Sequence, residues 1–117
     1  MTTLLAILQA VLAGLFISGE EIDAMDAHEV MSNVIVVAAA VQLVLVFLVR
    51  DWSQFRLLYW VAGLLVLVIA QVGLGYGSEE STLPEAIHIP LGVFIFGLAL
   101  VISMLAVLED RVRSATG

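Results

Sequence analysis

The sequence predicts an all-α membrane protein, a bundle of four transmembrane helices that forms a single domain over residues 1–117. Apolar residues make up 62% of the chain and charged residues only 13%, whereas about a quarter of a typical soluble domain is charged. A chain of 117 residues cannot hide so much apolar surface, because small domains have a high ratio of surface to volume. We therefore expect lipid to face most of this surface.

Four stretches without Asp, Glu, Lys or Arg account for the four helices. They contain 19, 20, 22 and 23 residues, close to the roughly 20 residues that cross a bilayer as a helix. Strands of a membrane β-barrel would be about half as long and would alternate in polarity, and no such alternation occurs. The expected helices cover residues 2–19, 27–49, 55–76 and 84–108.

Local signals indicate where the helices begin. The first segment has no basic start, and Ile17-Ser18-Gly19 is a poor cleavage site, so we expect a retained helix rather than a removed signal peptide. Asp26, followed three residues later by Glu29, is a capping-box pattern that predicts the start of the second helix near residue 27. Pro84 suits the first turn of the fourth helix.

The arginines are predicted to lie on one face of the membrane. Arg50 and Arg56 flank the loop between the second and third helices, and Arg111 and Arg113 follow the fourth. The other two loops lack Lys and Arg and hold eight of the eleven acidic residues. Because basic residues favour the cytoplasmic side, both termini are expected inside, in a multi-pass protein of the cytoplasmic (plasma) membrane. There is no basic patch for nucleic acid.

The two halves share a pattern that predicts a duplicated helical hairpin. A glutamine, a leucine and a small residue recur as Gln9, Leu12 and Ala13 and again as Gln71, Leu74 and Gly75. A second pattern recurs with steps of four, three and four residues, which keep its members on one helical face; they are His28, Ser32, Ile35 and Ala39, and His88, Gly92, Ile95 and Ala99. Small residues also occur in ordinary membrane-helix packing, but the two histidines are the only ones in the chain.

A histidine pair on two facing helices predicts an axially ligated haem, most simply a b-type haem, in the core of the bundle. His28 and His88 would be the metal ligands. Ser32 and Gly92, one turn below them, would leave room for the ring, above an apolar floor of Ile35, Ile95, Ala39 and Ala99. The expected helix starts place His28 about two residues and His88 about four or five residues inside their helices, a depth difference of about 4–5 Å.

Other roles of the histidines are less well supported by the residues. Zinc requires further ligands, and Glu29, next to His28, points about 100° away around the helix. A single interfacial histidine would more simply cap a helix end or meet lipid headgroups, but two at equivalent positions favour a shared site. Nucleophilic catalysis has no recognisable triad pattern here.

At these residues the chain resembles one half of the haem A synthase family, whose members consist of two similar four-helix bundles and include half-length forms. The resemblance rests on Gln71, Leu74, Gly75, His88 and His28. It implies that the two histidines are axial haem ligands. The family's catalytic glutamate position holds Met25, and the loop cysteines are absent, so the resemblance implies haem binding and leaves enzymatic activity open.

The predicted function is electron transfer or haem handling in the membrane, because two protein ligands leave no open position on the iron. Expected partners are the lipid bilayer and haem, with a second copy of the chain, a redox partner or quinone as further candidates. Two alternatives stay open: a cofactor-free accessory subunit of a membrane complex, and a small transporter that uses the two histidines with Gln42.

Overall fold

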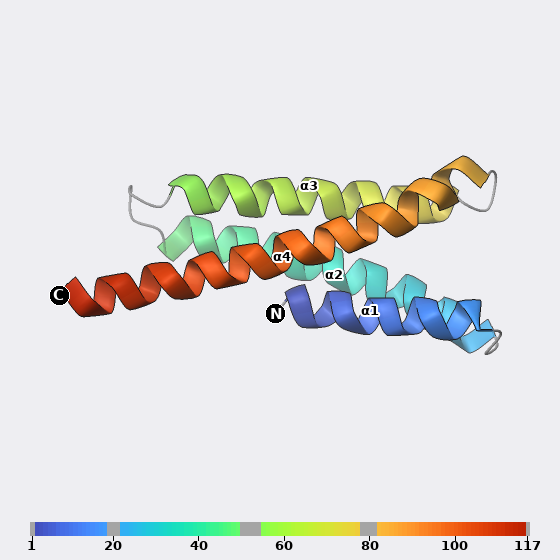
Figure 1. Ribbon diagram of the computed structural model, residues 1–117. Helices are drawn as coiled ribbons and strands as arrows, with labels where there is room; N and C mark the ends of the chain where they lie inside the picture. Colours follow the sequence, from blue (N-terminus) through green and yellow to red (C-terminus); the bar gives the residue numbers. More distant parts are fainter. Residues whose placement is uncertain (1, 19–21, 50–54, 78–81, 117) are drawn as a thin grey trace.

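The computed structural model has the predicted all-α class. It describes residues 2–18, 22–49, 55–77 and 82–116. These residues form four helices (Figure 1), namely α1 (Thr2–Ile17), α2 (Ile22–Val49), α3 (Phe55–Gly77) and α4 (Thr82–Thr116).

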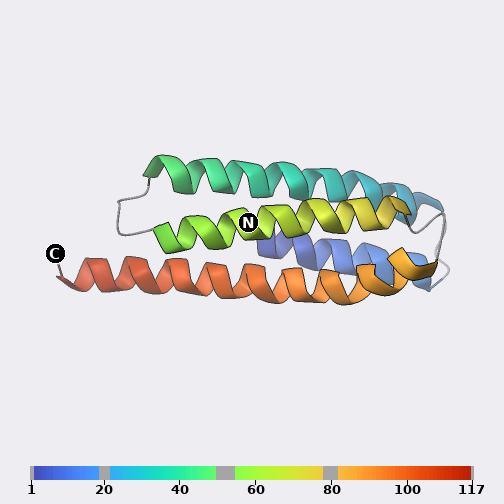
Figure 2. The same cartoon turned by 90° about the horizontal axis from the view of Figure 1, so that it is seen from above.

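Successive helices run in opposite directions and form an elongated bundle of 54 × 22 × 20 Å (Figures 1 and 2). α1 packs against α2 and α4, and α3 packs against the same two helices. Among the described residues, no close backbone contact joins α1 to α3 or α2 to α4. The helices that carry the two histidines, α2 and α4, therefore lie diagonally across the bundle.

Three of the four helices are long and apolar enough to cross a membrane. Their apolar parts are Asp26–Leu48, Arg56–Gly77 and Ala86–Val112, with 23, 22 and 27 residues. Large apolar side chains such as Val30, Leu48 and Val66 are more than 60% exposed on the outside of the bundle, as expected for a surface in contact with lipid. These features indicate a membrane protein.

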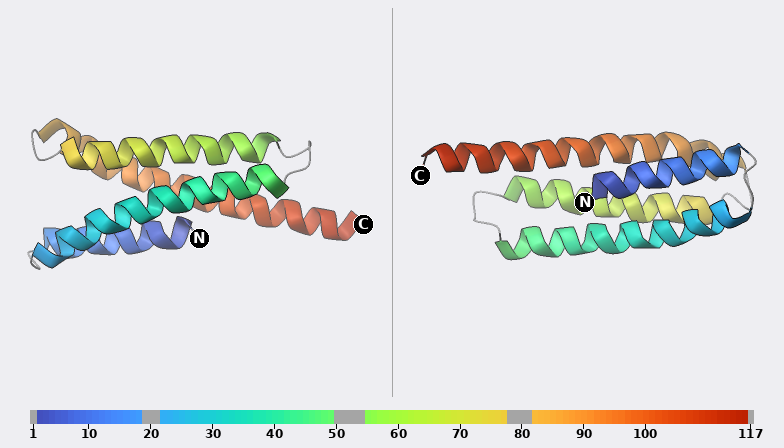
Figure 3. Two further views of the ribbon diagram at one scale, coloured as in Figure 1. Left: turned by 180° about the vertical axis from the view of Figure 1, so that it is seen from behind. Right: turned by 90° about the horizontal axis from the view of Figure 1, so that it is seen from below.

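α1 is shorter than the sequence analysis expected. Its 16 residues correspond to about 24 Å at 1.5 Å per residue, less than the roughly 30 Å of a hydrocarbon core. It lies beside only the part of the bundle where α2 and α4 begin (Figures 1 and 3). Near its start, Thr2 Oγ1 donates to Gln42 Oε1 of α2. The hydroxyl of Thr3 and that of Ser103 in α4 form a hydrogen bond of 3.1 Å.

Two of the predicted helix boundaries were wrong. α2 begins at Ile22, so Asp26 and Glu29 lie inside the helix and do not cap it. α4 runs from Thr82 to Thr116, well beyond the predicted end at residue 108. Both errors have one cause: a helix continues wherever its backbone hydrogen bonds and residue propensities allow, and it is not limited to the part without charges.

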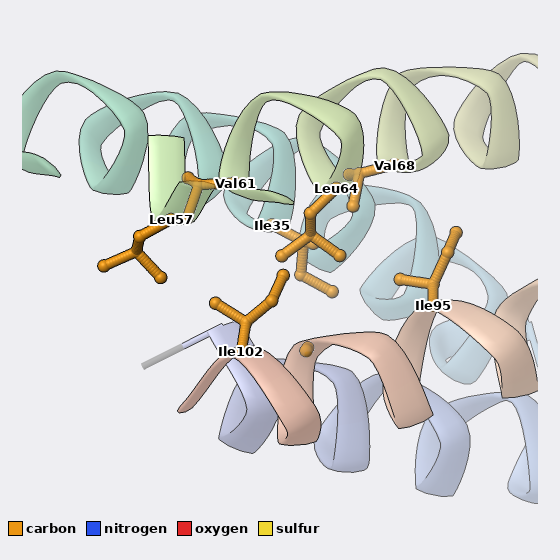
Figure 4. Close-up of a cluster of buried hydrophobic side chains, with 8 residues drawn as sticks. Ile35, Leu57, Val61, Leu64, Val68, Ile95 and Ile102 are labelled. Carbon is orange, nitrogen blue, oxygen red and sulfur yellow. The ribbon is translucent and has the colours of Figure 1, made fainter. Parts of the chain in front are cut away.

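The main core lies between α2, α3 and α4 (Figure 4). Val61 and Leu64 of α3 and Ile102 of α4 are almost completely buried, at 1–2% exposed. The cluster is completed by Ile35, Leu57, Val68, Ile95 and Ala99. This packing holds α2 and α4 on opposite sides of α3 and thereby determines how far apart their histidines lie.

Candidate functional site

The two histidines face each other across the bundle. Their ring centroids are 6.3 Å apart, and the ring planes make an angle of 62°. His28 follows the first residue of α2 by six positions, and His88 follows the first residue of α4 by six. The difference in depth that the sequence predicted is therefore absent, because α2 begins earlier than its apparent capping box.

A cavity of about 380 Å³ lies between the helices at the level of the histidines and below it. All four helices contribute to its wall. Of the residues that the sequence singled out, His28, His88, Ser32, Gly92, Ile35 and Ile95 line it. Ala39 and Ala99 are outside this lining; they are 1% and 2% exposed and are packed between the helices deeper in the bundle.

In the first hairpin, a glutamine from α1 is hydrogen-bonded beside the histidine of α2. Gln9 Nε2 donates to the backbone oxygen of His28 at 3.0 Å and to Ser32 Oγ at 2.6 Å. The Ser32 hydroxyl in turn donates to the same His28 oxygen at 2.9 Å. This network ties α1 to the turn of α2 that presents His28.

The second hairpin repeats the main contact. Gln71 Nε2, from α3, donates to the backbone oxygen of His88 at 2.8 Å. The His88 ring also meets α3, because its Nδ1 lies 3.1 Å from the backbone oxygen of Gln71. A carbonyl oxygen only accepts, so Nδ1 carries a proton, and in the neutral form of this ring the lone pair lies on Nε2.

Ser32 and Gly92 make room for the glutamines as well as lining the cavity. Ser32 receives the Gln9 amide, and a Cβ added at Gly92 would lie 3.0 Å from Gln71 Nε2. From the sequence, both positions were predicted to leave space for a macrocycle. Gln9 and Gln71 belong to a repeated pattern in the sequence, and this repeat beside the small residues was the available signal for the contact.

Glu29 is engaged away from the histidine pair. Its Oε1 accepts a hydrogen bond of 3.1 Å from the Tyr76 hydroxyl of α3. Among the described residues, no group of three or more His, Cys, Asp or Glu side chains is placed to hold a metal ion. The described part of the cavity therefore offers two imidazole side chains in a largely apolar surrounding, with the amides of Gln9 and Gln71 and the Ser32 hydroxyl beside them.

These residues could hold a cofactor that brings most of its own metal ligands. The cavity wall around the histidines is largely apolar, with Ala6, Ala10, Val72, Val93 and Phe96 among its members. Such a wall suits a flat apolar ring better than a hydrated ion. No family model, curated protein sequence or solved structure matches the chain.

Proposed function

We propose that this chain is an integral membrane protein that binds one b-type haem through His28 and His88 and serves in electron transfer or haem handling. The observation that carries the proposal is the separation of 6.3 Å between the two imidazole centroids across a cavity that both rings line. This geometry supports the assignment of both histidines as haem ligands.

The separation of the two rings leaves room for one metal ion between them, because metal–imidazole bonds are about 2.0–2.1 Å long. The centroid distance of 6.3 Å also lies in the range of about 4.5–7 Å for edge-to-face ring pairs. The cavity favours the metal interpretation, since a ring pair that merely packs would leave little space around it.

The residues present also fit the needs of a haem. A macrocycle supplies four equatorial nitrogens, so two histidines complete the coordination of its iron. The lone pair on Nε2 of His88 is the form required of a ligand, and the cavity of about 380 Å³ is within the roughly 300–1,000 Å³ of cofactor pockets. When bound, haem would supply a one-electron redox centre. His28 and His88 would occupy both axial positions, while the apolar wall excludes water and favours electron transfer.

The placement in the membrane is part of the proposal. We take α1 as a fourth apolar span that packs within the bilayer, and both termini as cytoplasmic in the plasma membrane. In support, Arg56 at the start of α3 and Arg111 near the end of α4 lie at the same end of the bundle. The histidines lie toward the opposite, outer end. Arg50, Glu20, Glu21, Glu79 and Glu80 are outside the described residues.

Origin by duplication of a hairpin, and kinship with one half of haem A synthase, belong to the same proposal. The equivalent hydrogen bonds from Gln9 to His28 and from Gln71 to His88 support an internal repeat. In both hairpins the amide reaches the backbone oxygen of the histidine in the following helix. Chance matches in apolar sequence would not be expected to reproduce a long-range polar contact.

Absorption spectroscopy of the purified protein tests the proposal. The protein, isolated in mild detergent with haem available, should show the Soret and α bands of a six-coordinate low-spin haem at one haem per chain. His28→Ala and His88→Ala should each convert this spectrum to a five-coordinate or haem-free one, and the double variant should lose haem. Asn33→Ala, at an exposed residue of α2, is the matched control and should retain the wild-type spectrum.

Two results would contradict the proposal in different ways. If the folded protein takes up no haem, the cavity has another role and the accessory-subunit alternative is favoured. If haem binds but both single histidine variants keep the wild-type spectrum, haem is held elsewhere and these histidines are not its ligands.

A further inference from the structure

We infer that the histidine cavity opens sideways into the lipid between α1 and α4, and that through this opening the protein takes up its haem from the membrane. The inference rests on the proposed function for the identity of the ligand, whereas the opening itself rests on how the two helices pack. It goes beyond the proposed function by naming the source of the ligand, which is the bilayer and not the surrounding water.

α1 and α4 are in contact at one end and diverge toward the other. Near the start of α1, the hydroxyls of Thr3 and Ser103 join the two helices through a hydrogen bond of 3.1 Å. Toward the end of the bundle where α4 begins, the helices move apart (Figures 1 and 3). The histidine cavity lies near this wider end, because His88 follows the first residue of α4 by six positions.

In the described part of the cavity, the exposed wall residues belong to α1 and α4. Ile89 and Val93 of α4 line the cavity and are nevertheless 56% and 69% exposed. Ala10 and Gly14 of α1 line it as well and are also exposed. The lining residues of α2 and α3 are all buried or half-buried. The cavity therefore opens between these four residues, which we call the α1–α4 seam.

The α1 side of the seam consists of small residues with open space beside them. Ala6, Ala10 and Gly14 follow one another in steps of four and lie on one face of the helix. Small residues at such steps commonly let two membrane helices approach closely, but a Cβ added at Gly14 would meet nothing within 4 Å among the described residues. At Gly92, by contrast, an added Cβ would lie 3.0 Å from Gln71 Nε2. The small residues of α1 thus leave an opening where they could have closed a helix pair.

The seam lies in the apolar part of the bundle and has an apolar rim. Ile89 and Val93 come three and seven residues after the start of the apolar span Ala86–Val112, which is about 5 and 10 Å along the helix. The four residues of the seam carry neither a charge nor a hydrogen-bonding side chain. Because acyl chains face such a rim, a flat apolar ligand can move from the lipid into the cavity without contact with water.

The opening leads to the two histidines, because the seam and both imidazoles belong to one cavity. Its floor is closed by Ile35, Val68 and Ile95, which also line the cavity and are only 3–7% exposed. The chain has no cysteine, so haem cannot be attached through the thioether bonds of a c-type site. A ligand held without covalent bonds needs a way into the bundle, and the seam provides one beside its two ligands.

The rate of haem uptake tests the route. Haem is added to phosphatidylcholine vesicles that contain the haem-free protein, and growth of the Soret band gives the rate. Gly14→Phe should slow uptake about tenfold, because its ring would occupy the opening. Gly73→Phe is the matched control and should leave the rate unchanged, since Gly73 is an exposed glycine of α3 outside the cavity lining that also has open space around an added Cβ.

Equal rates for the two variants would mean that the ligand enters from the water at the end of the bundle, and this result would overturn the inference. A second blocking variant covers the case in which Gly14→Phe does not fold. Ala10→Phe places a ring in the same seam one turn away and should slow uptake to a similar extent.

The opening can also be detected without haem. An aryl diazirine dissolved in the vesicles labels the residues that it reaches on illumination, and mass spectrometry locates the label. In the haem-free wild type, label should appear on Ser32 and Gln71, half-buried residues of α2 and α3 that line the cavity. Gly14→Phe should reduce this labelling several-fold, while Tyr59, which is 72% exposed, stays labelled.

The labelling separates failure of the opening from failure of the proposed function. Absence of label from Ser32 and Gln71 in the wild type would overturn the inference, whatever the protein binds. If both residues are labelled but the folded protein takes up no haem, the assignment of the ligand fails together with the proposed function, whereas the lateral opening stands.

Discussion

Replacement of Gly92 by alanine would test the fit between the glutamine of one helix and the small residue of the next. The new Cβ would lie 3.0 Å from Gln71 Nε2, closer than the 3.4–4 Å of ordinary van der Waals contact. Gln71 would have to move, and its hydrogen bond of 2.8 Å to the His88 backbone oxygen would lengthen or break. Gly97, in the same helix and with nothing within 4 Å of an added Cβ, provides the control.

The expected magnitude follows from the difference between the two variants. Both substitutions gain about 0.5–1 kcal/mol from the replacement of a helical glycine, so that contribution cancels. Gly92→Ala alone loses a hydrogen bond, worth about 0.5–1.5 kcal/mol, and leaves a buried amide without a partner, which costs about 1–3 kcal/mol. Hydrogen bonds between membrane helices average nearer 0.6 kcal/mol. We therefore expect Gly92→Ala to be less stable than Gly97→Ala by about 1–2 kcal/mol.

Reversible unfolding in mixed micelles of mild detergent and dodecyl sulfate, followed by circular dichroism, gives the two free energies of unfolding. The haem-free protein should be used, so that ligand binding does not contribute. If the free energies of unfolding of the two variants agree within about 0.3 kcal/mol, Gln71 does not limit the space at Gly92. The expected loss of a hydrogen bond worth about 1 kcal/mol is then refuted.

Three other experiments test the membrane placement, the cavity and the attachment of α1. A cysteine at Glu79, which lies outside the described residues, should be labelled from outside by an impermeant reagent while one at Arg56 is not; the reverse pattern would invert the topology. Gly92→Leu should lower the haem-to-protein ratio, measured by pyridine haemochrome, relative to Gly97→Leu, and equal ratios would mean that the cavity does not hold the ring. Thr2→Val should lower the free energy of unfolding by about 1 kcal/mol without altering haem content, and an unchanged stability would show that the bond to Gln42 is not important.

The helices and the pairing of the histidines could be predicted from sequence because both depend on strong local signals. Long stretches without charge identify membrane-length helices with little ambiguity. The steps from His28 through Ser32 to Ile35 identify one helical face, and antiparallel neighbours with short connections leave α2 and α4 on opposite sides of the bundle. The observed centroid distance of 6.3 Å agrees with this prediction of proximity, and the ligand role stays a prediction.

The helix ends and the length of α1 could not be predicted in the same way. Asp26 and Glu29 have the spacing of a capping box, but such residues are also compatible with a helix interior, and here the preceding turn from Ile22 is helical as well. The first charge-free stretch extends to Gly19, whereas the described helix ends at Ile17. Charge-free length measures apolarity, and here it overestimates the helix, because Ser18 already lies outside α1.

The role of the glutamines was hidden for a different reason. The partner of each amide is a backbone oxygen, of His28 for Gln9 and of His88 for Gln71, and a backbone group has no sequence signature of its own. Only the geometry shows that the small residue one turn after each histidine is the place where the amide fits. A pattern of glutamine and small residue on adjacent helices therefore predicts more than close packing.

The polar contacts around each histidine lie within one hairpin, and this divides the control of the site into two parts. Gln9 and Ser32 act on His28, and Gln71 acts on His88; these bonds set how each imidazole is presented. The distance between the imidazoles depends instead on packing between hairpins, through the core and through the Tyr76–Glu29 and Thr3–Ser103 bonds. Because apolar packing changes spacing by fractions of an ångström while a lost hydrogen bond frees the helical turn that carries the ring, core substitutions should alter the distance between the imidazoles and glutamine substitutions their orientation.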